Sequence, residues 1–270
     1  MSIRQFRPRG DRRRGISTNQ SLIIYGGFSL SLLLQILYPL VHGQTLLFVT
    51  IATVYTGAVV MLAHAWLSYG ARYAITFFIL TFGIALGIEL LGSKTGWPFG
   101  RYAYDASLGI QINGVPLIVP FAWIMMAHPI LVAARKVTQN WVFLFGGFGL
   151  MAWDLFLDPQ MVAAHRWTWK VVGPHVPFQP EIPLSNAAGW LFAGMGLMAI
   201  LHVALPKEHR KRGANTTLID LTLIWTWFSG VVGNLFFFHR TGVALFSGFV
   251  FAFVLVPYLF QARFGRPDDL

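Results

Sequence analysis

The sequence predicts an all-α polytopic membrane protein with about eight transmembrane helices. Hydrophobic residues make up 56% of the 270 residues, only 11% are charged, and the mean hydropathy is +0.60. So few charges cannot cover the surface of a water-soluble domain of this length. The apolar residues also gather in runs of about 20, the length that crosses a bilayer as a helix. These runs fall at 21–41, 45–68, 72–92, 114–134, 141–158, 184–205, 217–238 and 241–262.

The segment 1–20 is expected to be a disordered basic tail on the cytoplasmic side. It carries six arginines and no apolar face, and basic clusters of this kind are attracted to anionic lipid headgroups. The paired arginines are similar to a targeting signal. However, the run that follows has full spanning length and no evident small-residue cleavage site, so we expect it to be retained as the first helix.

The distribution of Lys and Arg predicts that both ends of the chain are cytoplasmic. With the N-terminus inside, 15 of the 20 Lys and Arg residues lie on the inner side, in agreement with the positive-inside rule. One helical domain then covers 21–262, with outer loops at 93–113 and 159–183 and a cytoplasmic tail at 263–270. The chain is expected in the cell (cytoplasmic) membrane. Its net charge of +10 is explained by this topology and not by nucleic-acid binding.

Two aspartates four residues apart, Asp154 and Asp158, are the leading candidates for function. They close the apolar run 141–158, and on a helix this spacing places them on one face. An acid in hydrocarbon is costly unless it is paired, hydrated or used. The alternative is a pair of helix-end acids that are hydrated at the membrane boundary.

Further polar residues are expected in the same outer layer of the membrane. Glu89 lies near the outer end of its span, Asn186 at the outer start of the sixth span, and Asn234 near the outer end of the seventh. Polar groups at membrane depth face a bundle interior or a wet cavity, so we expect one common pocket. Alternatively, Asn186 caps its helix and Asn234 makes an interhelical hydrogen bond.

Small residues predict which spans touch. Gly83 and Gly87 lie on the span that carries Glu89, and Gly146 and Gly147 precede the aspartates. Small residues four apart allow close helix packing in membranes. We therefore expect the third and fifth spans to pack together and to bring Glu89 toward the aspartate pair.

The two outer loops are rich in aromatic residues, among them Trp97, Tyr102, Tyr104, Trp167 and Trp169. Each of these alone is typical of the aromatic belt at a membrane interface. As a group beside acids, they are also suited to line an apolar pocket and to stabilise a cation on their ring faces.

Several kinds of chemistry are disfavoured. There are no cysteines, which excludes disulfides and thiolate chemistry. The eight histidines form no HxxxH or HxxHH box of a di-iron enzyme, and His128 is expected to be a hydrogen-bonded packing residue. The spacing of Asp154 and Asp158 is similar to the magnesium-binding acids of intramembrane prenyltransferases, but the second acidic motif of those enzymes is absent. No phosphate-binding or dinucleotide-binding glycine motif is present.

Five short motifs occur in a fixed order between about Thr95 and Trp190. They are 96–104 (GWPFGRYAY), 114–116 (GVP), 152–159 (AWDLFLDP), 167–169 (WTW) and 182–190 (IPLSNAAGW). In this set and order the chain resembles the carotenoid biosynthesis membrane proteins, the family that includes bisanhydrobacterioruberin hydratase and related carotenoid 1,2-hydratases.

The resemblance implies addition of water to the terminal C=C bond of a long acyclic carotenoid, with a C50 bisanhydrobacterioruberin-like or a lycopene-like end. Protonation of such an alkene gives a tertiary carbocation, which water captures, and this chemistry needs no cofactor or metal. One carboxyl must stay protonated while its partner stays ionised. We assign Asp154 as the acid and Asp158 as the base or water-orienting group, with Glu89 as the substitute for either.

The expected substrate-binding residues are Trp97, Arg101, Tyr102, Tyr104, Asp105, Trp167, Trp169, Asn186 and Asn234. Asp105 is also explained as an ordinary solvated loop acid. Two alternatives stay open, a carotenoid cyclase or isomerase that uses the same acid and a proton-coupled transporter that is not an enzyme. The expected partners are the carotenoid and the lipid bilayer, without nucleic acid, and association with other carotenoid biosynthesis enzymes stays open.

Overall fold

In the part of the chain that the structure describes, eight helices are long and apolar enough to cross a membrane, so the predicted class and number of spans are confirmed. The computed structural model describes residues 16–206 and 214–265. The helices are α1 (Thr18–Leu37), α2 (Gly43–Tyr69), α3 (Ala71–Thr95), α4 (Ile118–Val137), α5 (Val142–Ala163), α6 (Leu184–Ala204), α7 (Thr217–Val232) and α8 (Thr241–Phe264). A short helix η1 (Tyr38–Leu40) follows α1, and a π-helical turn η3 (Gly233–Phe237) follows α7.

The ends of the chain are only partly covered by the described residues. Helix α1 begins at Thr18, where Ser17 and Gln20 form a reciprocal capping box, so the last residues of the predicted tail are helical. Most of that tail and the last five residues lie outside the described part. The cytoplasmic placement of both ends stays a prediction.

Helix α5 is longer than predicted and changes the setting of the aspartates. It continues through Pro159 to Ala163, so Asp158 lies five residues before the helix end. Asp154 is 1% exposed and Asp158 is 2% exposed. The alternative of hydrated acids at a helix end is therefore wrong, because both carboxyl groups are enclosed by the bundle.

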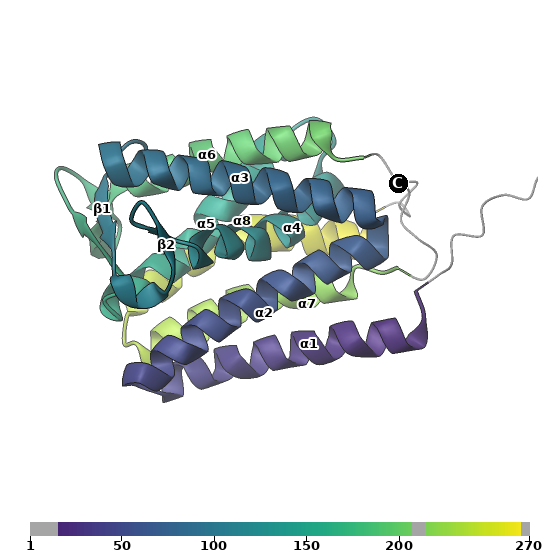
Figure 1. The fold of residues 1–270 in the computed structure, drawn as a ribbon, viewed down its shortest axis with the longest axis horizontal. Helices are drawn as coiled ribbons and strands as arrows, with labels where there is room; N and C mark the ends of the chain where they lie inside the picture. Colours follow the sequence, from purple (N-terminus) through teal and green to yellow (C-terminus); the bar gives the residue numbers. More distant parts are fainter. Residues whose placement is uncertain (1–15, 207–213, 266–270) are drawn as a thin grey trace, which may run out of the picture.

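Helices α4, α5 and α8 lie in the middle of the bundle, with α3 and α6 on one side and α1, α2 and α7 on the other (Figure 1). The two long loops gather at one end. In them, β1 (Arg101–Tyr104) pairs antiparallel with β4 (Trp167–Lys170), which aligns Tyr102 with Trp169 and Tyr104 with Trp167. Two hairpins, β2 (Gln111–Ile112) with β3 (Val115–Pro116) and β5 (His175–Val176) with β6 (Gln179–Pro183), complete this end. We call residues 96–117 and 164–183 the strand cap.

The predicted packing of the glycines of the fifth span on the third is wrong. A Cβ atom added to Gly147 of α5 would lie 2.5 Å from Cγ and 2.6 Å from the backbone nitrogen of Met195 in α6. Gly83 and Gly87 of α3 have no such neighbour within 4 Å. The small residues of α5 therefore seat α6, the helix that carries Asn186, and not α3.

This packing makes a test of the fold. The substitution Gly147→Ala is expected to destabilise the protein by about 3 kcal/mol, because its methyl group would meet backbone that cannot move aside cheaply. Gly83→Ala is the matched control, since open space surrounds that position and alanine is the better helix former. Thermal unfolding of the detergent-solubilised protein measures both. Equal stability of the two variants would contradict the close α5–α6 contact.

Candidate active site

The aspartate pair of α5 shares one amide donor from α6. Nδ2 of Asn186 donates to Oδ2 of Asp154 at 3.0 Å and also to Oδ2 of Asp158. Nε1 of Trp167 in β4 donates to Oδ1 of Asp158 at 3.2 Å. Asn186 does not cap its helix, because the N-cap residue is Pro183 and no side chain caps it. Its role is thus to hold two buried carboxyl groups against each other.

Glu89 of α3 is a second buried acidic group, and it is 3% exposed. Its Oε2 atom accepts hydrogen bonds from the hydroxyls of Tyr102 at 2.6 Å and Tyr104 at 2.8 Å. Nε1 of Trp123 in α4 donates to Oε1 at 3.3 Å. All three partners are donors, an arrangement suited to an ionised carboxylate, which only accepts hydrogen bonds.

The surroundings of the two β1 tyrosines keep their hydroxyl groups protonated, so that they can donate hydrogen bonds. Burial, together with the nearby Glu89 charge, raises the pKa of Tyr102 and of Tyr104 well above the usual value of a phenol. Both hydroxyls therefore stay protonated over the physiological pH range. Gly92 makes room for this contact, since a Cβ atom there would lie 2.6 Å from the Tyr102 hydroxyl oxygen.

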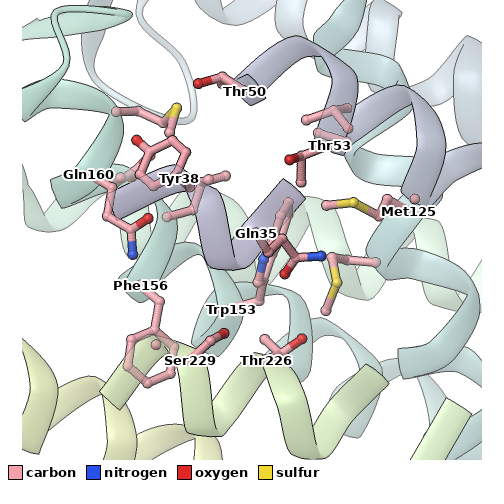
Figure 2. Close-up of a pocket in the computed structure, with 18 of the residues that line it drawn as sticks. Gln35, Tyr38, Thr50, Thr53, Met125, Trp153, Phe156, Gln160, Thr226 and Ser229 are labelled. Atoms are coloured by element: carbon pink, nitrogen blue, oxygen red, sulfur yellow. The ribbon is translucent and has the colours of Figure 1, made fainter. Parts of the chain in front are cut away.

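A cavity of about 380 Å³ lies beside these acids and is lined mainly by apolar and aromatic side chains. Glu89, Asp158 and Asn186 line it, whereas Asp154 does not. Along α7 and η3 its wall runs from Thr222 to Phe237, which is about 22 Å at the rise of a helix. Side chains from α1, α2, α4, α5 and α7 surround the space (Figure 2). The cavity is therefore long, narrow and parallel to the helices.

Aromatic rings from the strand cap and from three helices form the wall next to the acids. Trp123 and Trp190 stack with ring centroids 4.3 Å apart, and Trp153 meets Trp190 edge to face at 5.8 Å. Tyr102 packs on Trp169 and Tyr104 on Trp167, with centroids 6.0 and 5.6 Å apart. All seven rings line the cavity, so its acidic side is also rich in aromatic rings.

The structure places four of the expected substrate-binding residues away from the cavity lining. Trp97 is 65% exposed in the turn before β1, and Arg101 is exposed at the start of that strand. Asp105 accepts a hydrogen bond from the backbone N–H of Ser107 at 2.8 Å and caps the short helix Ala106–Leu108. Hydrogen bonds with Ser107 lower the pKa of Asp105. Asn234 donates to the carbonyl of Gly230 within its own helix at 2.8 Å, so the expected interhelical bond is also not formed by this nitrogen.

Sequence reasoning missed Trp123 and Trp153 as wall residues and used Trp190 only as part of a motif. Trp153 directly precedes Asp154, which was a usable signal. Trp123 lies in an apolar stretch of α4 with no local pattern that points to Glu89. His128 lies on the same helix, 2.9 Å from His64 between ring nitrogens, as expected for a hydrogen-bonded packing residue.

The spacing of Asp154 and Asp158 raises the question of a metal site. Within residues 16–206 and 214–265, no group of three or more His, Cys, Asp or Glu side chains is placed to hold a metal ion.

Comparison with known proteins adds independent findings. The family described as carotenoid biosynthesis protein matches residues 42–256. The bisanhydrobacterioruberin hydratase of Haloarcula japonica is 30% identical over 161 residues, which cover 56% of this chain and 53% of that protein. The match thus spans about half the length of this relative. No solved structure matches the chain.

Proposed function

The chain belongs to the carotenoid biosynthesis protein family, and from this premise we propose that it is a hydratase of long acyclic carotenoids. It would add water to the terminal C=C bond of a C50 or lycopene-like end and give a tertiary alcohol. The observation that carries the proposal is that two buried carboxyl groups, those of Glu89 and Asp158, line the same long aromatic-lined cavity. The name of the Haloarcula relative supports the same class of reaction.

Hydration of an unactivated alkene makes three demands on a site. It needs a proton donor against the less substituted alkene carbon, a surface that stabilises the tertiary cation, and a base for the water that attacks it. The cavity wall contains candidates for all three within one cluster. A cavity that extends about 22 Å along one helix also suits the end segment of a linear polyene.

Asp158 is the proton donor in this proposal. The sequence favours Asp154 for that role, but Asp158 is the member of the pair that lines the cavity, and a group must reach the alkene to protonate it. Asp154 lies behind it and shares the amide of Asn186. We therefore give Asp154 a positioning role, in which it holds Asp158 and shares one proton with it.

In this proposal Glu89 is the anion that stabilises the carbocation and the base that accepts a proton from the attacking water. Its three donors hold it as an acceptor, and it lines the same cavity as Asp158. The carboxylate offsets the charge of the cation, and the rings of Trp167 and Trp169 add cation–π attraction. When water forms the C–O bond, its proton passes to Glu89. Return of this proton to the Asp158 carboxylate restores both groups, so alkene plus water gives alcohol with no other reactant.

The experiment is to express the chain in bacteria that accumulate lycopene, and separately in bacteria that accumulate a C50 acyclic carotenoid. The expected result is a pigment heavier by one or two waters, detected by mass spectrometry. A pigment of unchanged mass and altered retention would favour a cyclase or isomerase instead. Unchanged pigment in membranes that contain the folded protein would contradict a carotenoid substrate of either kind.

A further inference from the structure

Four residues that line the cavity are also exposed on the outside of the bundle. They are Ile36 at 47%, Leu40 at 56%, Phe228 at 48% and Phe237 at 46%. The first two belong to the end of α1 and to η1, and the other two belong to α7 and η3. Every other residue in the cavity lining is buried or only partly exposed. The cavity therefore opens at the seam between α1 and α7.

This opening faces the hydrocarbon and not water. The exposed rim residues are large and apolar, and both helices are long enough to span the membrane. Helix α1 lies at the edge of the bundle, next to α2 and on the same side as α7 (Figure 1). Between Trp225 and Phe237 the α7 side of the seam is about 18 Å long. A ligand that passes here must come from the lipid phase.

Among the described residues, two side-chain contacts bridge the seam where the cavity meets it. Nε1 of Trp225 donates to Oε1 of Gln35 at 3.0 Å, and the rings of Tyr38 and Phe238 meet edge to face with centroids 6.1 Å apart. All four residues line the cavity, and Gln35 and Tyr38 are both labelled among its lining side chains in the close-up (Figure 2). Side-chain hydrogen bonds between membrane helices are weak, so this seam can part without loss of backbone structure.

We propose that the seam between α1 and α7 is a lateral portal through which a linear polyene dissolved in the bilayer enters the cavity. The Gln35–Trp225 hydrogen bond holds α1 and α7 together when this portal is closed. The inference rests on the proposed function for the identity of the ligand. The long apolar slot and its lipid-facing rim are the features that select a chain-like hydrocarbon over a water-soluble substrate.

The portal is tested by locking it. The chain has no cysteines, so the pair Gln35→Cys and Trp225→Cys can be joined by a short thiol-reactive cross-linker that reduction cleaves. The matched control joins α2 to α4 through Tyr55→Cys and Phe121→Cys, whose native rings are 5.0 Å apart and lie outside the cavity lining. Both pairs are made in an Asp158→Asn background, so that uptake is measured without reaction.

Uptake is followed with lycopene in liposomes. Lycopene is achiral, so a circular dichroism signal in its visible band reports binding in the chiral cavity. The cross-link between α1 and α7 is expected to slow the appearance of this signal at least tenfold, and reduction is expected to restore it. The α2–α4 cross-link is expected to leave the rate unchanged.

The outcomes separate the portal from the proposed reaction. Unchanged uptake with a complete α1–α7 cross-link, identified by mass spectrometry of the joined peptides, overturns the portal. Equal slowing by the control cross-link, or no signal in the unlinked chain, also overturns it. If the chain with native Asp158 takes up lycopene through the seam but yields no hydrated pigment from any acyclic carotenoid, the portal stands and the hydration proposal fails.

Discussion

Replacement of Asp158 by asparagine is expected to reduce carotenoid hydration at least about 10³-fold, the scale of a lost general acid. The amide has nearly the same shape as the carboxyl group but carries no transferable proton. Trp167 and Asn186 donate to different oxygens of Asp158, so the single amide oxygen of asparagine keeps one of these two hydrogen bonds. The loss of the other bond is a cost of about 1 kcal/mol, which the fold is expected to survive. The measurement is the rate of mass gain in pigment from membranes that contain equal amounts of folded protein.

Asp154→Asn is the matched control for this prediction. It lies one helical turn away, shares the same Asn186 donor, and is equally buried, but it does not line the cavity. If Asp154 only positions Asp158, its loss should cost about tenfold in rate and should not abolish turnover. The reverse order of the two effects would assign the proton donor to Asp154, as the sequence favours.

The fold was largely predictable because hydrocarbon imposes simple rules on a sequence. Apolar runs of about 20 residues predict the eight helices. Acidic residues within such runs are costly, which makes Glu89, Asp154 and Asp158 candidate functional residues. The partners of these acids were harder to predict. The link between Glu89 and β1 runs through Tyr102 and Tyr104, which follow it by 13 and 15 residues across an irregular turn.

Two features depend on contacts that a local pattern does not encode. The glycine spacing predicts that α5 has a face of small residues on which another helix can pack closely. It does not identify that helix, which in the structure is α6, through Met195. The cavity is a second case. Its walls combine Gln35, Trp123 and Trp225 from three helices that are distant in sequence. Only the three-dimensional arrangement shows that Glu89 and Asp158 line this cavity together.

The substitution Glu89→Gln is expected to reduce hydration about 10²-fold or more while the protein stays folded. The glutamine carbonyl oxygen can still accept from Trp123, and the phenol hydroxyls of Tyr102 and Tyr104 can rotate to accept from the new amide group. What is lost is the negative charge beside the cation and the base for the attacking water, and preorganised charge of this kind is typically worth several kcal/mol in the transition state.

Variants of Tyr102 and Tyr104 test whether the charge of Glu89 or its exact position matters for the reaction. Tyr102→Phe and Tyr104→Phe each remove one of the two hydroxyls that hold Oε2 of Glu89 but keep the ring and the carboxylate, so each is expected to cost only about tenfold. Rates are compared at equal folded protein, with pigment binding measured alongside. If Glu89→Gln keeps the full rate while both phenylalanine variants lose stability, Glu89 is only the structural anchor of β1 on α3. A loss confined to the rate, with binding unchanged, instead supports an anion that acts on the cation.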